Sequence, residues 1–141
     1  MVLVQVQWPW RTYEIALNIR NGDIVWANGP FPCGAYPDRK IAKEEGLENS
    51  LENGERYVAN RGYRGSRAVT PDEGDYCLQQ MMKLVRARHE MVNERFKQFG
   101  ILSQVFRHKA HKHGIVSGAI ANITRITICE ESPLFQVNYI E

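Results

Sequence analysis

This 141-residue sequence has little cysteine, no long hydrophobic run and almost no net charge. Its three cysteines, Cys33, Cys77 and Cys129, are odd in number and far apart, which argues against a disulfide framework and against a zinc site of paired cysteines. No apolar run approaches the length of a membrane span, and residues 1–6 lack the basic start and small-residue cleavage site of a signal peptide. We therefore expect an intracellular protein in a reducing compartment, with no membrane span.

Glycine and proline are limited too, with 11 and 6 residues respectively. Together with 24% charged and 10% aromatic residues, this composition argues against a disordered, collagen-like or solenoid chain. The 43% hydrophobic content supplies enough apolar side chains for a core at this length. We expect one domain over residues 1–141.

Charge is unevenly distributed, although the 18 basic and 16 acidic residues nearly cancel. Residues 1–55 carry 5 basic and 8 acidic side chains, residues 56–114 carry 12 and 5, and residues 115–141 carry 1 and 3. A basic middle between acidic ends predicts a phosphate-facing surface. The same pattern is equally typical of a long, solvated helix.

The first half of the chain contains short strand and loop signals. Residues 12–19 and 23–27 are rich in β-formers and flank Asn21-Gly22, which predicts a two-residue hairpin. Residues 28–37 hold three prolines and two glycines, which predicts a loop. A short helix at 39–45, a short strand at 56–59 and a loop at 60–67 are expected to follow.

A long helix is the clearest element of the sequence. Pro71 is typical of a helix start, and Gly100 would end the helix. Its apolar residues recur every three or four positions and form one stripe, which comprises Leu78, Met81, Met82, Val85, Val92, Phe96 and Phe99. A second helix, rich in Ala, Ile and Gly and expected to be buried, is predicted at 111–128, and a closing strand at 135–140. The expected fold class is α/β.

Polar residues occupy much of the other face of the long helix, namely Lys83, Arg86, Glu90, Asn93, Glu94 and Lys97. Two interpretations are open. A solvated helix face would hold only weak surface pairs, such as Arg86 and Glu90 at positions i and i+4. A carboxylate among basic groups would instead suit a site for a metal ion and a phosphate.

Several longer motifs occur in a consistent order and spacing. They are residues 21–41 (NGDIVWANGPFPCGAYPDRKI), 55–65 (ERYVANRGYRG), 86–102 (RARHEMVNERFKQFGIL), 106–108 (FRH) and 133–139 (PLFQVNY). Together they resemble the catalytic domain of DDE-superfamily transposases of the Harbinger type, from about residue 13 to the end. The resemblance implies an RNase H-like fold, a mixed sheet flanked by helices, in a nuclear protein. It also implies an acidic triad that holds two Mg²⁺ or Mn²⁺ ions for phosphodiester cleavage and strand transfer.

The resemblance implies that one acid of this triad is present. The third acid, on the long helix, is matched by Glu90 after His89. The second acid directly precedes the element matched by residues 61–63, and that position holds Asn60. Asn60 therefore replaces the second acid of the family.

The first acid of the family lies on a strand upstream of the segment matching residues 12–14, and residues 1–11 contain no acid. We therefore expect the sheet to lack its first strand, which the β-prone residues 2–7 could replace. A missing strand would leave a sheet edge that an assembly has to cover.

Two lost carboxylates argue against catalysis by this chain alone. Magnesium and manganese need hard anionic oxygens, and a carboxamide carries no charge. Losing catalytic groups that act as a unit costs many orders of magnitude in rate. We expect no cofactor, with weak or no metal binding at Glu90, and Mg²⁺ or Mn²⁺ only if the site is completed.

Three functions remain open at this point. The chain is either a transposase-derived, non-catalytic module that binds nucleic acid or protein, a metal-dependent nuclease completed by a partner chain or longer product, or a structural subunit of a larger assembly. In the first case, the basic middle would bind DNA without sequence preference. The residues expected to face phosphates are Arg61, Arg64, Arg67, Lys83, Arg86, Lys97, Arg107, Lys109 and Lys112.

Three histidines, His108, His111 and His113, are spaced loosely like metal ligands. The surrounding basic residues disfavour a divalent cation, and no cysteine is near. We expect these histidines to serve at a helix start or in phosphate contacts.

Overall fold

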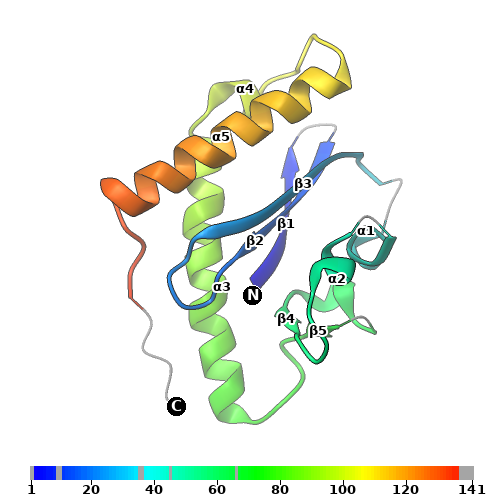
Figure 1. Ribbon diagram of the computed structural model, residues 1–141, viewed down its shortest axis with the longest axis vertical. Coiled ribbons are helices and arrows are strands. Elements are labelled where there is room, and N and C mark those ends of the chain that lie inside the picture. Colours follow the sequence, from blue (N-terminus) through cyan, green and yellow to red (C-terminus); the bar gives the residue numbers. More distant parts are fainter. Residues whose placement is uncertain (1, 9–10, 35–36, 45, 66, 137–141) are drawn as a thin grey trace.

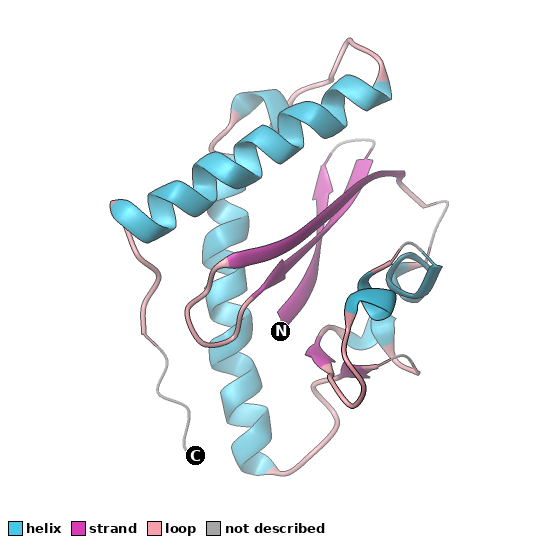
Figure 2. Cartoon of the chain, viewed as in Figure 1, coloured by secondary structure: helices cyan, strands magenta, loops and turns pink. Residues whose placement is uncertain are grey.

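The computed structural model describes residues 2–8, 11–34, 37–44, 46–65 and 67–136. The chain has a mixed α/β fold with a five-stranded sheet and two long helices, α3 and α5 (Figure 1, Figure 2). The strands are β1 (Val2–Trp8), β2 (Arg11–Leu17), β3 (Ile24–Pro32), β4 (Tyr57–Val58) and β5 (Ala68–Val69). The helices are α1 (Asp38–Glu44), α2 (Leu47–Ser50), the 3-10 helix η1 (Arg61–Tyr63), α3 (Tyr76–Lys97), α4 (Gly100–Ser103) and α5 (Ala110–Glu130).

The strands lie in the order β3-β2-β1-β4-β5. The first three form an antiparallel meander, while β4 pairs in parallel with both β1 and β5. The place beside β2 that a missing strand would leave open is filled by residues 2–8 themselves. The edge that an assembly was expected to cover is therefore paired within the chain, and the edges of the sheet are β3 and β5.

β2 and β3 form the hairpin predicted from Asn21-Gly22, but the prediction of a two-residue turn is wrong, because the loop spans residues 18–23. Gly22 has a φ of +75°, in the left-handed region that glycine adopts without strain, and its N–H donates to the Asn18 carbonyl at 2.9 Å. The prediction of a loop over 28–37 is wrong for its first five residues, because β3 continues to Pro32. A strand at the sheet edge tolerates prolines, since an edge residue can lack its N–H without breaking a ladder bond.

Helices cover both faces of the sheet. Alternate residues of β2 point to opposite faces, so each face of this strand packs against a different set of helices. Tyr13, Ile15 and Leu17 pack with residues of α3, α4 and α5 in one core cluster. Ala16 packs with residues of α1, α2 and η1 in another. β2 is thus buried on both of its faces.

The apolar stripe predicted for the long helix is the buried face of α3. Its fully buried members are Met82, Val85, Val92 and Phe96, while Leu78, Met81 and Phe99 are partly buried. α3 begins at Tyr76 rather than at Pro71, because the Asp75 side chain accepts a hydrogen bond from the Leu78 N–H at 2.9 Å. A side-chain cap of this kind is a strong start for a helix.

α5 matches the helix predicted at 111–128 but is buried on one face only. Its inner face contacts β3 and α3, while Ile115 and Ile126 on its outer face are exposed. Of the closing strand predicted at 135–140, residues 135–136 have no regular structure and the rest lie outside the described residues. No helix in the described ranges combines the length and apolarity needed to cross a membrane.

Candidate functional site

A pocket of about 530 Å³ lies where the parallel strands β4 and β5 end. It is lined by Asn60, Arg61, Gly62, Pro71 and Arg86, which we call the basic pocket. Asn60 follows β4, Pro71 follows β5, and Arg86 belongs to α3. In α/β sheets, ligands commonly bind in the crevice beyond the carboxyl ends of parallel strands. The basic pocket is therefore the candidate functional site.

Asn60 shapes the basic pocket through its own backbone turn. Its Oδ1 accepts a hydrogen bond from the Gly62 N–H at 2.8 Å and so caps η1. Tyr63, at the end of η1, is fully buried and donates its hydroxyl hydrogen bond to Glu14 Oε1 on β2 at 3.1 Å. These two bonds hold η1 against the sheet and thereby place Arg61 at the pocket.

The charge around the basic pocket is positive. Asp72 forms ion pairs with Arg64 and, at 3.4 Å from its Oδ1 to Nε, with Arg61. One carboxylate facing two guanidinium groups leaves one positive charge, and Arg86 adds another. These side chains are solvent-exposed, so salt screens their field.

Glu90 lies one helical turn beyond Arg86 on α3, is exposed, and does not line the basic pocket. The charge of Glu90 acts on Lys97 of the same helix, whose Nζ is 2.7 Å from Glu94 Oε1. The hydrogen bond that Lys97 donates to Glu94 raises the pKa of Lys97, and the charges of Glu94 and Glu90 raise it further. The structure thus places Arg86, rather than Glu90, in one pocket with Asn60.

The pocket donors do not fit Mg²⁺ or Mn²⁺. These ions need several anionic or carbonyl oxygens, whereas Asn60 Oδ1 already accepts from Gly62 and Arg61 and Arg86 bring positive charge. Within the described part of the chain, no three His, Cys, Asp or Glu residues group together as a metal site. Guanidinium groups instead suit an anion such as phosphate.

The basic residues expected to form one phosphate-facing strip fall into two groups separated along α3 (Figure 1). The first group lies at or near the basic pocket and comprises Arg61, Arg64, Lys83 and Arg86. The second group lies between the end of α3 and the start of α5 and comprises Lys97, Arg107, Lys109 and Lys112. Arg86 of the first group and Lys97 of the second are 11 residues apart on α3, which is about 16 Å along the helix, so the two groups are separate surfaces.

Arg67, the remaining member of the expected strip, binds within the chain. Its guanidinium donates to the carbonyls of Glu48, Leu51 and Glu52 at 3.3, 3.2 and 2.5 Å. Carbonyls at the end of a short helix lack partners within the helix and need external donors. Arg67 therefore holds the end of α2 and is not placed to contact a phosphate.

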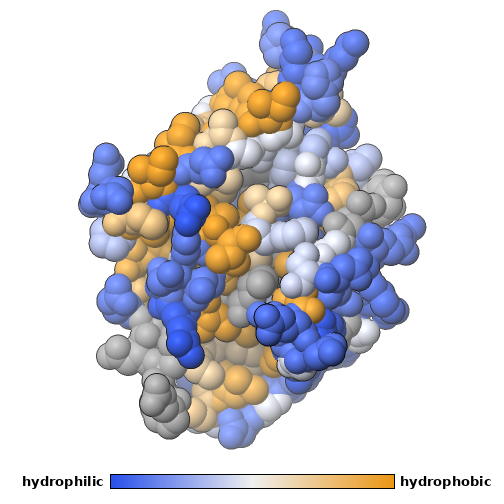
Figure 3. All heavy atoms as spheres, in the orientation of Figure 1, coloured by the Kyte–Doolittle hydropathy of each residue, from blue (hydrophilic) through white to orange (hydrophobic). Residues whose placement is uncertain are grey.

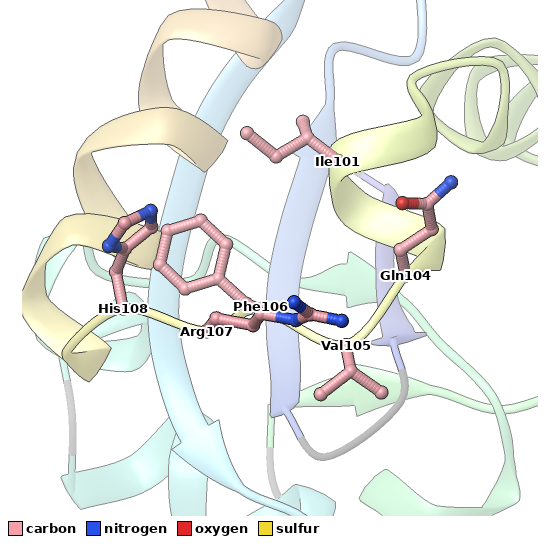
Figure 4. Close-up of a pocket in the computed structure, with 6 residues that line it drawn as sticks. All are labelled: Ile101, Gln104, Val105, Phe106, Arg107 and His108. Atoms are coloured by element: carbon pink, nitrogen blue, oxygen red, sulfur yellow. The ribbon is translucent and has the colours of Figure 1, made fainter.

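A second pocket, of about 490 Å³, lies beside the second basic group. It is lined by Ile101, Gln104, Val105, Phe106, Arg107 and His108 (Figure 4). The Phe106 ring packs edge-on against His108, with ring centroids 5.4 Å apart, and against His113 at 4.7 Å. Arg107 is the only lining residue with a permanent positive charge, so this pocket is less basic than the first.

The three clustered histidines have different surroundings. His108 and His111 are exposed, whereas His113 is buried, stacks on Tyr13 and forms a hydrogen bond with its hydroxyl. Burial raises the pKa of Tyr13 to about 12 and lowers the pKa of His113, which the charge of Arg11 lowers further. Both buried groups are therefore neutral at pH 7. His113 lies in the first turn of α5, as the helix-start alternative predicted, while its burial in the core argues against the alternative of a phosphate contact.

Sequence reasoning missed several ionisable residues inside the fold, among them Glu14, Arg88 and His89. Glu14 and His89 have no exposed surface. Burial lowers the pKa of His89 to about 4, although a hydrogen bond with the backbone of Ile15 acts in the opposite direction and raises it. The available signal for Glu14 was its position in a strand with apolar residues on both sides, since such strands are buried on both faces.

The basic pocket has donors for an anion and, among the described residues, no grouped acids to hold a metal. No protein-family model, curated protein or solved structure matches this chain. The donors and charges of the pocket are therefore the basis for its function.

Proposed function

We propose that this chain is a non-catalytic domain, derived from a DDE-type transposase, that binds the phosphate backbone of DNA at the basic pocket. The mixed sheet with helices on both faces is compatible with the RNase H-like fold that the resemblance implies. The observation that carries the proposal is the presence of Arg61 and Arg86 around Asn60, at the position where the family has an acid.

Replacing an acid by Asn60 changes which ligand this position favours. A carboxylate would repel a phosphate unless a metal ion lay between them. The neutral carboxamide removes that repulsion, while the guanidinium groups of Arg61 and Arg86 attract the phosphate directly. The same substitution that removes metal-dependent catalysis therefore favours direct phosphate binding.

Binding of this kind is weak and independent of sequence. Phosphate contacts position a protein on DNA without reading bases, and non-specific dissociation constants are about 10⁻⁴–10⁻⁶ M at physiological salt. Each phosphate contact to duplex DNA contributes about 0.9 to the slope of log affinity against log salt. The salt slope therefore measures how many contacts the basic pocket supplies.

The test is fluorescence anisotropy of a labelled duplex titrated with the full chain, from low to moderate salt. The double variant Arg61→Ala/Arg86→Ala should weaken binding and reduce the salt slope by about 2. The matched control is Arg107→Ala/Lys109→Ala, which removes the same charge from the second basic group. This variant should keep most of the salt slope of the unchanged chain. No binding at low salt, or an equal loss in both double variants, would refute the pocket as the DNA site.

A further inference from the structure

The outer face of α5 is apolar. Ile115, Ile123 and Ile126 are 69%, 49% and 60% exposed, and Gly118 and Ala119 are exposed between them. Figure 3 shows hydrophobic residues along the length of this helix on the face turned to the viewer. A surface helix normally carries polar residues on its outer side, so an apolar outer side indicates an interaction surface.

Part of this face has an internal symmetry. Ile115, Ala119, Asn122 and Ile126 follow one another at intervals of four, three and four positions, so they form one stripe along the helix. Ile115 and Ile126 are equally far from the midpoint of the stripe, which lies between residues 120 and 121, and so are Ala119 and Asn122. The stripe is therefore complementary to itself when one helix is reversed.

We propose that α5 packs antiparallel against α5 of a second copy of this chain, about a two-fold axis near residues 120 and 121. In this arrangement Ile115 faces the partner's Ile126, and Ala119 faces the partner's Asn122. Lys112, one turn before the stripe, lies level with the partner's Cys129 and so next to the partner's Glu130. The interface uses the same patch on both copies, as a two-fold symmetric dimer requires.

Charge favours a second copy as the occupant of this face. The start of α5 is basic, with Lys109 and Lys112, and its end is acidic, with Glu130 and Glu131. Antiparallel packing brings each basic end onto an acidic end, whereas parallel packing would bring like charges together. Antiparallel helix dipoles also attract.

Gly118 supports a close approach of the two helices. A Cβ built at Gly118 meets no heavy atom within 4 Å, so the fold of the single chain does not require a glycine there. Glycine is unfavourable in a helix interior. In the dimer, Gly118 and Ala119 leave room for the partner's Asn122 beside the backbone, which gives the glycine a role.

One helix pair buries less surface than the roughly 1,000 Å² typical of stable interfaces, so the dimer is weak. The test is sedimentation velocity on the full chain from about 10 μM to about 1 mM, which spans weak dissociation constants. A concentration-dependent shift from monomer to dimer is expected. Ile126→Glu should weaken the dimer by at least about tenfold, while the control Leu84→Glu, at a side chain 47% exposed on α3, should not.

Two further variants test the arrangement itself. Lys112→Glu should weaken the dimer, and adding Glu130→Lys should restore it, because the swap recreates two opposite-charge pairs only in the antiparallel arrangement. Gly118→Leu should weaken the dimer without lowering the thermal unfolding temperature, since its side chain points into open space in the single chain.

The proposal is overturned by any of three outcomes. The chain could sediment as a monomer at every concentration, Ile126→Glu could behave like Leu84→Glu, or the charge swap could fail to restore association. If this face bound a different protein instead, the pure chain would sediment as a monomer at every concentration.

Discussion

The buried His89 makes the stability of this fold depend on pH. Its imidazole has no exposed surface, and burial lowers its pKa to about 4 because the charged form is disfavoured away from water. In the unfolded chain the group has its ordinary pKa, about 6.5. Between these values the unfolded state binds more protons than the folded state, so the free energy of unfolding falls as the pH falls.

The size of this effect follows from the two pKa values. A fall from 6.5 to about 4 corresponds to about 3 kcal/mol at about 1.36 kcal/mol per unit, reached in full below pH 4. At pH 5 the loss relative to pH 7.5 is about 2 kcal/mol. His113, whose pKa is also lowered by burial, adds a loss of the same sign.

The assay is urea unfolding followed by circular dichroism at several pH values from 7.5 to 5. The His89→Leu variant should keep only the smaller pH dependence that His113 supplies, whereas His111→Gln, at an exposed histidine, should behave like the unchanged chain. Proton NMR of the folded chain should show no titration of the His89 imidazole above pH 5. An unfolding free energy that is constant from pH 7.5 to 5, or equal losses with and without His89, would refute this reasoning.

Two other outcomes are expected. Tyr63→Phe removes the hydroxyl that donates to the buried Glu14, so the free energy of unfolding in urea at pH 7 should fall by about 1–3 kcal/mol; unchanged stability would contradict this. The unchanged chain should not cleave DNA in Mg²⁺ or Mn²⁺, and Asn60→Asp, which keeps the η1 cap, should bind these ions better and duplex DNA less tightly without gaining cleavage. Nicking of a supercoiled plasmid by the unchanged chain that Glu90→Ala abolishes would refute the non-catalytic assignment.

Elements with a local signal could be predicted from the sequence. The stripe of α3 and the Asn21-Gly22 hairpin each depend on residues close together in the chain. The course of β3 through Pro30 and Pro32 could not be predicted in this way, because prolines are tolerated only by the edge position of the strand. The start of α3 was predicted at Pro71, whereas the Asp75 side chain caps the helix and sets its start at Tyr76.

Less of the candidate site could be predicted. Asn60 and Arg86 are far apart in the sequence, and the end of β4 and the packing of α3 bring them together. The resemblance suggested Glu90 as the neighbour of Asn60. Arg86, one turn earlier on α3, lines the pocket instead. The inward role of Arg67 also had no signal, since its acceptors are backbone carbonyls.

A count of the basic residues in the middle of the chain predicts a larger nucleic-acid surface than the structure supports, because some of these residues bind elsewhere. Arg67 is bonded to carbonyls, and in the proposed dimer Lys112 faces a carboxylate of the partner, so neither is available to phosphate. The basic pocket and the α5 face then share no residue and should respond separately. Ile126→Glu should leave the salt slope of duplex binding unchanged, and Arg86→Ala should leave sedimentation unchanged. A single variant that altered both readouts would mean that the dimer itself creates the phosphate site.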